Sequence, residues 1–529
     1  MSTAHLPSSH LRTRLLGLLP LLALLMAILT LSTHIRLRVM LGDEGVTCVN
    51  AWRLAMGQMP GKDFFEIIPP FSFYVLSLLF RVAGPTLIAS RALAFVYGCL
   101  LPLLLLLLSR RLFTAPVARA LPVAFMIPFG VCAWPIPSHH WLVDILQLGA
   151  ILAWLLALER APLPWSFCAG ALSGLAVMTL QDQGLYWIAA ATFLVLPTAP
   201  RATRKALALG WCGGGALALT VAAATLLPGA GLQLLVRDWF LLPLTHYQPS
   251  QGRFQETGAG WSEVLRSLHG GAFSQSPVLA TLALLSYVLV FALPLLAALS
   301  VLSLWRSRLF DKRRLAVLLA AALAFVGGAL HRWTIMNLVW AAAAPSLLLA
   351  AQADNWLEST SKWRRWTAYS FCAAVLGLFF LFGALRSYQV MRGPVYEVSA
   401  PAGNIATLYL PEAEAVREYL DAIVRLVPNG TPAFAYGYVP LVGFLTGHPN
   451  PTKYTVLLTA SGYNSREQGQ EWIAEVESGN IQWGFSPRWA VTPEDPVARY
   501  LVESFEPAWQ NGFFILWRRR FSPKPGSGG

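Results

Sequence analysis

A stretch of acidic and basic residues follows the first long apolar run of the chain. Asp43 and Glu44 stand side by side at its start, and Glu66 stands near its end, before two prolines. An ionised carboxylate can take a proton from a hydroxyl group, and a cationic side chain can bind a phosphate that leaves. These residue types predict a group-transfer site, with Asp43 and Glu44 as catalytic carboxylates. The substrate-binding candidates of the same region are Glu66, Lys62 and Arg91.

The composition indicates that these residues belong to a membrane protein. Of 529 residues, 56% are hydrophobic and 12% are charged, about half the charged share of a soluble domain. Apolar stretches that are long enough to cross a bilayer, which takes about 20 residues per helix, recur along the first three quarters. The formal net charge of +13 is interpreted as loop charge on the cytoplasmic side, not as affinity for nucleic acid. The six cysteines show no metal-ligand spacing and imply no disulfide framework.

We predict a polytopic α-helical membrane protein with about 11 transmembrane helices. Arginines 12 and 14 precede the first apolar run, which we interpret as a signal anchor, and they place the N-terminus in the cytoplasm. Basic residues then recur in every second loop, and the odd number of spans places the C-terminus outside. The expected spans lie at about 14–33, 90–108, 117–135, 140–158, 163–180, 184–199, 205–227, 277–304, 313–330, 335–352 and 366–386.

Residues 69–83 are apolar but too short to cross a bilayer, so we expect them to lie in the outer interface. Loop 34–89 is then wholly external and holds two short helices, at about 45–57 and 69–82. Residues 1–387 form the predicted transmembrane domain. Residues 388–522 form a small external α/β domain, in which "TPAFAYGYVPLVGFLTG", "IQWGFSPRWAVT" and "GFFILWRRR" are predicted strands and "LPEAEAVREYLDAIVRL" is a predicted helix. Residues 523–529 are a flexible tail.

Further polar residues fall on the same external face and are candidates for substrate binding. His140 and Asp144 are four residues apart and share one face of a helix, although a structural His–carboxylate pair would look the same. An acid at the edge of the membrane, such as Asp182, often has a function. A long external loop contributes His246 and Tyr247, and His331 and Arg332 are available for a phosphate or for anchoring at the interface.

The predicted helix centres carry almost no charge, whereas a transporter usually needs ionisable groups or broken helices near the midplane. A lipid-linked substrate that lies in one membrane face fits this distribution better. If the donor is a sugar on a polyprenyl phosphate, one carboxylate base would promote backside displacement at the anomeric carbon and invert its configuration.

The order of these residues resembles a known family. Asp43-Glu44, "GQMPGKDFFE", the prolines 69 and 70, and Arg91 are similar to the GT-C integral-membrane glycosyltransferases, in particular the bacterial aminoarabinose transferase and protein O-mannosyltransferase-like enzymes. The resemblance implies an inverting transferase that uses a polyprenyl-monophosphate sugar, with the first Asp of the pair as general base. Two departures stand out. Relatives often carry a lysine at the position of Gln181, and two residues rather than one separate Glu66 from the prolines.

Other readings of the sequence stay open. A pyrophosphate-linked glycan ligase or oligosaccharyltransferase, a lipid-linked glycan transporter and a non-catalytic assembly protein are the alternatives. No cofactor and no metal ligand set is required by the spacing, although a divalent metal is conceivable. The expected partners are the polyprenyl-phosphate-linked donor, membrane lipids and an external acceptor, which could be a glycolipid, a polysaccharide or a protein. The expected location is the inner membrane of a bacterium, with a periplasmic active site.

Overall fold

The computed structural model describes residues 8–37, 40–247, 276–307, 310–330, 334–459 and 463–520, with only the backbone for 8–15 and 246–247. The chain forms two compact units, each assembled from three segments. Unit 1 comprises residues 1–35, 92–224 and 252–394, and unit 2 comprises residues 36–91, 225–251 and 395–529. The sequence predicted a boundary between a transmembrane domain and an external domain at residues 387/388. The two compact units are defined by contacts within the chain and do not test that boundary, which stays a prediction.

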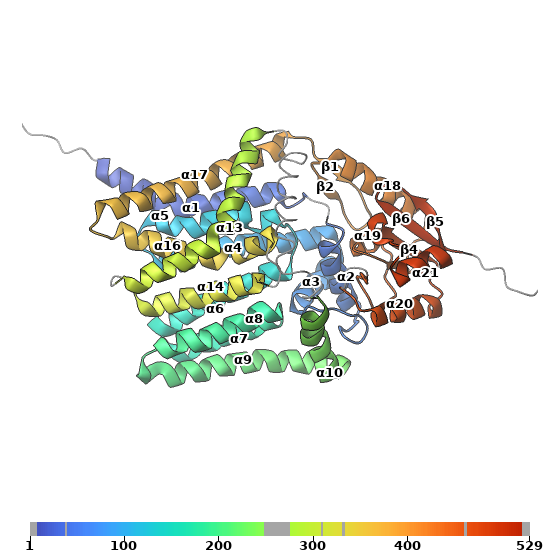
Figure 1. Cartoon of the computed structure of the whole chain (residues 1–529), viewed down its shortest axis with the longest axis horizontal. Helices are drawn as coiled ribbons and strands as arrows, with labels where there is room; N and C mark the ends of the chain where they lie inside the picture. Colours follow the sequence, from blue (N-terminus) through green and yellow to red (C-terminus); the bar gives the residue numbers. More distant parts are fainter. Residues whose placement is uncertain are drawn as a thin grey trace, which may run out of the picture. The chain divides into compact units, whose positions relative to one another are not determined.

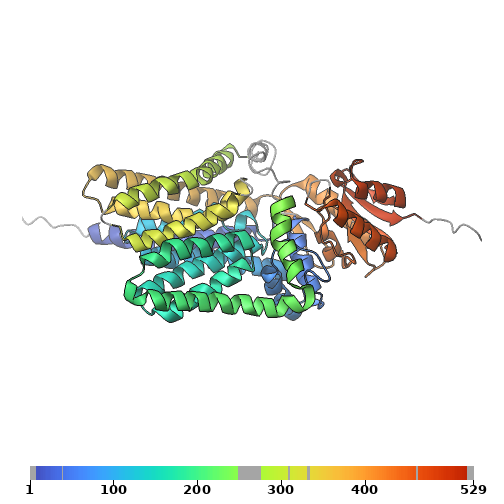
Figure 2. The ribbon, with the colours of Figure 1, turned by 60° about the horizontal axis from the view of Figure 1, so that its bottom comes forward.

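Unit 1 is a bundle of helices, most of which run side by side (Figures 1 and 2). Several of its helices begin where a serine, an aspartate or a proline can satisfy or omit the first backbone N–H groups. Ser138, Asp311 and Ser361 cap three of them. Apolar stretches then continue each helix. The helices are α1 (Ser8–His34), α4 (Leu87–Leu112), α5 (Pro116–Phe129), α6 (His139–Glu159), α7 (Pro162–Val177), α8 (Gln181–Ala190), α9 (Arg201–Ala230), α13 (Pro277–Arg306), α14 (Lys312–Ala329), α15 (Ile335–Ala341), α16 (Ala343–Leu357) and α17 (Lys362–Arg392). Residues 87–91 of α4 and 225–230 of α9 belong to unit 2.

Among the described residues, 7 helices are long and apolar enough to cross a membrane, or up to 8 if the bent pair α15–α16 is one span. The chain is thus a polytopic helical membrane protein, and its count of eleven spans stays a prediction. Three of the predicted spans are short or broken in the structure. Helix α7 has 16 residues, α15 and α16 meet at 59°, and the predicted span 184–199 is divided into α8, a π-helical turn and a 3-10 turn.

Unit 2 contains the two short helices that were expected in the first loop. They are α2 (Asp43–Ala55) and α3 (Phe71–Ala83), and each is too short to span a bilayer. The segment that follows α9 adds α10 (Leu232–Val236) and two π-helical turns, η4 (Arg237–Leu241) and η5 (Pro243–Tyr247).

The C-terminal part of unit 2 contains a small mixed sheet in the order β3-β4-β6-β5, in which β3 and β4 are parallel and the other neighbours are antiparallel. Helix α18 packs on one face, where Tyr419 stacks on Phe514, and α20 and α21 lie on the other face (Figure 1). A two-stranded ladder, β1-β2, lies apart from this sheet. The elements are β1 (Tyr396–Val398), β2 (Ile405–Thr407), α18 (Leu410–Leu426), β3 (Ala433–Ala435), α19 (Pro440–Thr446), α20 (Arg466–Ser478), β4 (Trp483–Pro487), α21 (Pro496–Ser504), β5 (Phe505–Gln510) and β6 (Phe514–Arg519).

One predicted strand was wrong over half of its length. The segment "TPAFAYGYVPLVGFLTG" forms the short strand β3 and then helix α19. Pro440 occupies the first turn of α19, and Gly447 ends the helix in the left-handed region at φ 74°. Both residues are typical boundaries of a helix.

Two glycines allow α19 and its preceding loop to approach the acidic pair closely. A Cβ atom on Gly45 would lie 2.2 Å from the backbone nitrogen of Leu441, and one on Gly42 would lie 2.1 Å from the ring of Tyr438. The same nitrogen of Leu441 donates a hydrogen bond to the carbonyl of Leu41 at 3.0 Å. Helices α2 and α19 are therefore held together at backbone contact distance.

The substitution Gly45→Ala should destabilise unit 2, because the added methyl group meets backbone atoms that cannot rotate away. We expect a loss of about 1–3 kcal/mol, the usual cost of overpacking. Thermal unfolding of the purified protein would measure it. Gly512→Ala is the matched control, since a Cβ atom there meets nothing within 4 Å. Equal melting temperatures for the two variants would contradict the prediction.

Candidate active site in unit 2

Asp43 is the first residue of helix α2, and its side chain is partly exposed. The hydroxyl group of Tyr438 donates a hydrogen bond to its Oδ1 atom. Tyr438 belongs to the loop between β3 and α19, and its ring covers Gly42. The carboxylate is thus held in position by a residue from the C-terminal part of the chain and stays partly accessible. Such a group can act as a hydrogen-bond acceptor or a base.

Glu44, the next residue, is fully buried and forms an ion pair with Arg91. The contact is bidentate: Nε lies 2.5 Å from Oε1, and Nη2 donates to Oε2 at 2.6 Å. Nη1 of Arg91 donates to the carbonyl of Leu37 at 3.1 Å. Burial raises the pKa of Glu44, and the charge of Arg91 opposes that shift. Two of the predicted site residues therefore bind each other, and both belong to unit 2.

Glu66 is buried, and no cation of the described residues forms an ion pair with it. It accepts hydrogen bonds from Asn50 Nδ2 at 2.7 Å and from the backbone nitrogen of Ile67 at 2.9 Å. Asn50 in turn accepts from the hydroxyl of Thr455 at 2.7 Å. Burial raises the pKa of Glu66 to about 7, although these hydrogen bonds act in the opposite direction. Glu66 is thus a carboxyl group that titrates near neutral pH.

Lys62 is exposed, whereas a residue that the sequence analysis did not select, Arg53, is buried nearby. The Arg53 guanidinium donates to the carbonyls of Thr452 and Asp63, at 2.9 and 2.8 Å, and to the side chain of Gln58 at 2.6 Å. Arg53 therefore fixes the loop that carries Lys62 and Glu66, and Lys62 is the cation of this loop that faces solvent.

The predicted residues of unit 1 occupy other surroundings. Asp144 is buried and accepts a hydrogen bond from Gln183 Nε2 at 2.9 Å, and the same nitrogen donates to Gln147 at 3.0 Å. The ring of His140 stacks on Trp340 at a centroid distance of 3.6 Å. Asp182 is partly buried and accepts the backbone N–H of Gln183 at 2.7 Å. Gln183 was not among the predicted site residues. It donates a hydrogen bond to the acid of α6 through its side chain and to the acid of α8 through its backbone N–H.

The remaining candidates are described only in part. His246 and Tyr247 lie in the backbone of η5, and their side chains are outside the description. His331 and Arg332 lie outside the described residues, as does the tail from 523 to 529. Within the described ranges, no group of three or more His, Cys, Asp or Glu residues is arranged to hold a metal ion.

Tyr438, Asn50 and Arg53 complete this arrangement, and sequence reasoning missed all three as site residues. Tyr438 lies in "TPAFAYGYVPLVGFLTG", a segment that was predicted as a strand of the external domain, so its position beside Asp43 could not be expected. Asn50 offered a weak signal, since a polar residue at an inward-facing position of a helix needs a partner. The arrangement brings together one accessible carboxylate, one buried ion pair and one buried carboxyl group, all in unit 2.

The whole fold is that of a known class of membrane protein, since it matches solved structures of ArnT. No protein-family model matches the sequence, and no curated protein matches it. ArnT from Cupriavidus metallidurans bound to undecaprenyl phosphate aligns with a TM-score of 0.55 and 12% identity, over 96% of this chain and 98% of that chain. The same protein in the apo state aligns with a TM-score of 0.52 and 14% identity, over 94% and 97%. The chain therefore has an ArnT-like fold along almost its full length.

The raised pKa of Glu66 predicts a stability that falls as the pH rises. Between its ordinary pKa of 4.5 and about 7, the folded state holds a proton that the unfolded state has lost, so the stabilisation is full below pH 4.5 and is lost as the pH approaches 7. Above pH 7 the cost of the buried charge is about 3 kcal/mol. Glu66→Gln should therefore be more stable than the wild type at pH 8 and similar at pH 4.5, measured by thermal unfolding. If the thermal stability of the two proteins changed with pH in the same way, the raised pKa of Glu66 would be refuted.

Proposed function

We propose that the protein is an inverting glycosyltransferase that moves one sugar from a polyprenyl-monophosphate donor to a hydroxyl group of an acceptor. The observation that carries the proposal is Asp43, a partly exposed carboxylate held by Tyr438 in a chain with an ArnT-like fold. The solved ArnT structure contains undecaprenyl phosphate, which supports a lipid-linked donor for this chain. On this proposal the active site faces the outside of a bacterial inner membrane, and the N-terminus is cytoplasmic.

In the proposed reaction Asp43 acts as the general base. The acceptor oxygen attacks the anomeric carbon, its proton passes to the carboxylate of Asp43, and the bond from that carbon to the phosphate oxygen breaks. The electron pair of the broken bond leaves with the polyprenyl phosphate. A single displacement from the side opposite to the phosphate inverts the anomeric configuration. The hydrogen bond from Tyr438 would keep one carboxylate oxygen oriented while the other receives the proton.

The ion pair between Glu44 and Arg91 supports different roles for the two acidic residues: Asp43 as the base and Glu44 as a residue that positions it. A buried guanidinium that already contacts a carboxylate and a backbone carbonyl is poorly placed to bind a second anion. We therefore assign Glu44 and Arg91 to positioning Asp43. Lys62, which is exposed, is the better candidate for the donor phosphate in the first loop, and His331 and Arg332 remain candidates outside it.

Asp43→Asn tests the base directly, because the amide keeps the shape of the side chain and can still accept the hydrogen bond from Tyr438. We expect sugar transfer to fall by about a hundredfold or more, the usual contribution of a general base. The assay uses purified protein with a panel of radiolabelled polyprenyl-phosphate sugars.

The matched control for this assay is Asp421→Asn, an exposed carboxylate on α18 in the same unit, which should keep wild-type activity. If the Asp43→Asn variant transferred sugar at the wild-type rate, Asp43 would not be the base. Retained anomeric configuration in the product would exclude the single displacement.

Tyr438→Phe should lower kcat by about tenfold and leave KM for the donor nearly unchanged. The phenol orients the base rather than the donor, and misorientation of a catalytic group reduces the rate of the chemical step. Tyr409→Phe is the control, since this tyrosine is 55% exposed at the start of α18. A rise in KM with unchanged kcat would instead place Tyr438 in donor binding.

A further inference from the structure

Basic side chains gather at one end of the helix bundle of unit 1. Segment 305–314 contains five basic residues and one acidic residue, and segment 358–366 contains three basic residues and one acidic residue. Helix α13 ends at Arg306, α14 begins at Lys312 and α17 begins at Lys362. These three helix ends lie at the same end of the bundle, at the left of Figure 1. Because α13 and α17 are long and apolar enough to cross a membrane, this basic charge lies where membrane-crossing helices end.

Hydrogen bonds hold these helix ends in place. The hydroxyl of Ser307 donates to Oδ1 of Asn355 at 2.7 Å, which joins the end of α13 to α16. Lys312 Nζ donates to three backbone carbonyls at the end of α13, at distances between 2.6 and 3.0 Å. Arg365 Nη1 donates to the carbonyl of Ser359 at 2.9 Å, in the turn between α16 and α17. Two of the cations therefore fix the backbone, and the cations next to them project from fixed helix ends.

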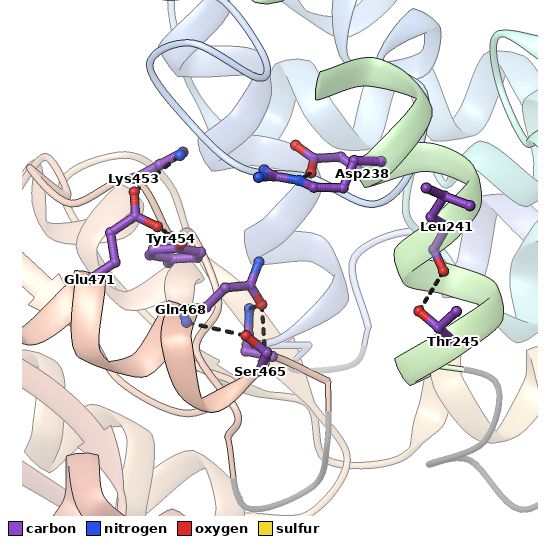
Figure 3. Close-up of polar contacts among 10 residues, drawn as sticks. Asp238, Leu241, Thr245, Lys453, Tyr454, Ser465, Gln468 and Glu471 are labelled. Atoms are coloured by element: carbon purple, nitrogen blue, oxygen red, sulfur yellow. Dashed lines mark hydrogen bonds and ion pairs between the residues drawn. The ribbon is translucent and has the colours of Figure 1, made fainter. Parts of the chain in front are cut away.

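Four other cations of this end are exposed. They are Arg306, Arg313, Lys362 and Arg364. Within the described parts of the chain, none of the four forms an ion pair with a carboxylate. In unit 2, by contrast, the cation Lys453 is paired with Glu471 at 3.2 Å (Figure 3). The end of unit 1 thus carries positive charge that its own described carboxylates do not neutralise.

Three exposed tryptophans accompany these cations. Trp305, Trp363 and Trp366 are 67%, 78% and 70% exposed, respectively. Trp363 and Trp366 are three residues apart on α17, so they share one face of the helix. Lys312 Nζ lies 5.9 Å from the centroid of the Trp305 ring. Exposed tryptophans beside lysine and arginine at the ends of spanning helices are typical of the headgroup region of a membrane.

The chemistry of this surface fits an anionic phospholipid. The phosphate of such a lipid carries a negative charge and acceptor oxygens, which match guanidinium and ammonium groups. Its glycerol region matches the amphipathic indole rings. A zwitterionic headgroup adds a cation of its own, which the surplus positive charge of the surface would repel. A nucleic acid or an acidic peptide would match the charge, but it would leave the tryptophans at the ends of the spanning helices without a partner.

We propose that this end of unit 1 binds the headgroup of an anionic phospholipid. The cations hold the phosphate oxygens, and the indole rings lie at the level of the glycerol. The surface consists of Trp305, Arg306, Arg313, Lys362, Trp363 and Arg364. All of these residues belong to unit 1, whereas Asp43 belongs to unit 2, so the lipid takes no part in the proposed transfer step. On the proposed topology the lipid belongs to the cytoplasmic leaflet.

The test measures lipid binding by native mass spectrometry, on full-length protein in a neutral detergent. The anionic probe is palmitoyl-oleoyl phosphatidylglycerol, and the zwitterionic probe is palmitoyl-oleoyl phosphatidylcholine. We expect the phosphatidylglycerol to bind about tenfold more tightly, with a preference that shrinks as salt is added, because salt screens exposed charges. Lys362→Gln combined with Arg364→Gln should weaken phosphatidylglycerol binding by about tenfold or more and leave phosphatidylcholine binding unchanged.

The matched control is Arg466→Gln combined with Arg499→Gln, which removes the same charge from exposed positions on α20 and α21 of unit 2. It should bind phosphatidylglycerol like the wild type. If the unit 1 variant does not fold, Arg306→Gln combined with Arg313→Gln replaces it. Equal affinity of the wild type for the two lipids would overturn the proposal. The same holds if the unit 1 variant and its control bind phosphatidylglycerol equally well.

Discussion

The buried ion pair between Glu44 and Arg91 is the interaction on which the rest of unit 2 depends. A carboxylate without exposure to water is stable as an anion only beside a well-placed cation, and the bidentate contact with Arg91 supplies one. This pair fixes the start of α2 against Arg91 within unit 2. The first turn of α2 in turn fixes the direction in which Asp43 leaves the helix.

Three carboxylates of one loop thus acquire three different environments. Asp43 is partly exposed and receives a tyrosine hydroxyl, Glu44 is neutralised by a guanidinium, and Glu66 is buried against an amide. Their intrinsic chemistry is almost the same, so the differences come from burial and partners. A base needs access to its proton source, which favours Asp43 for that role. The glycines on either side of the acidic pair are part of the same arrangement, because they allow the loop that carries Tyr438 to lie directly on it.

The sequence predicted the class of fold and the region of the candidate site, and the reason is compositional. Charged residues are rare in this chain, so the acid-rich segment stands out, and its short helices appear at α2 and α3. The roles within the segment depend on tertiary contacts. That Arg91 pairs with Glu44, and that Tyr438 reaches Asp43 from 395 residues away, cannot be inferred from spacing. The error at α19 was avoidable, because Pro440 and Gly447 are typical boundaries of a helix.

The same long separation has a consequence for the order in which the protein matures. Phe65 and Ile67 of the first loop belong to an apolar cluster whose other buried members come from residues 434 to 517. The hydroxyl that holds Asp43 comes from the same part of the chain. During synthesis the loop is made early, yet its partners leave the ribosome only near the end of translation. The segment therefore spends most of the time of synthesis without its hydrophobic cover. A chain that stops before the C-terminal domain carries the acidic residues but cannot complete their surroundings.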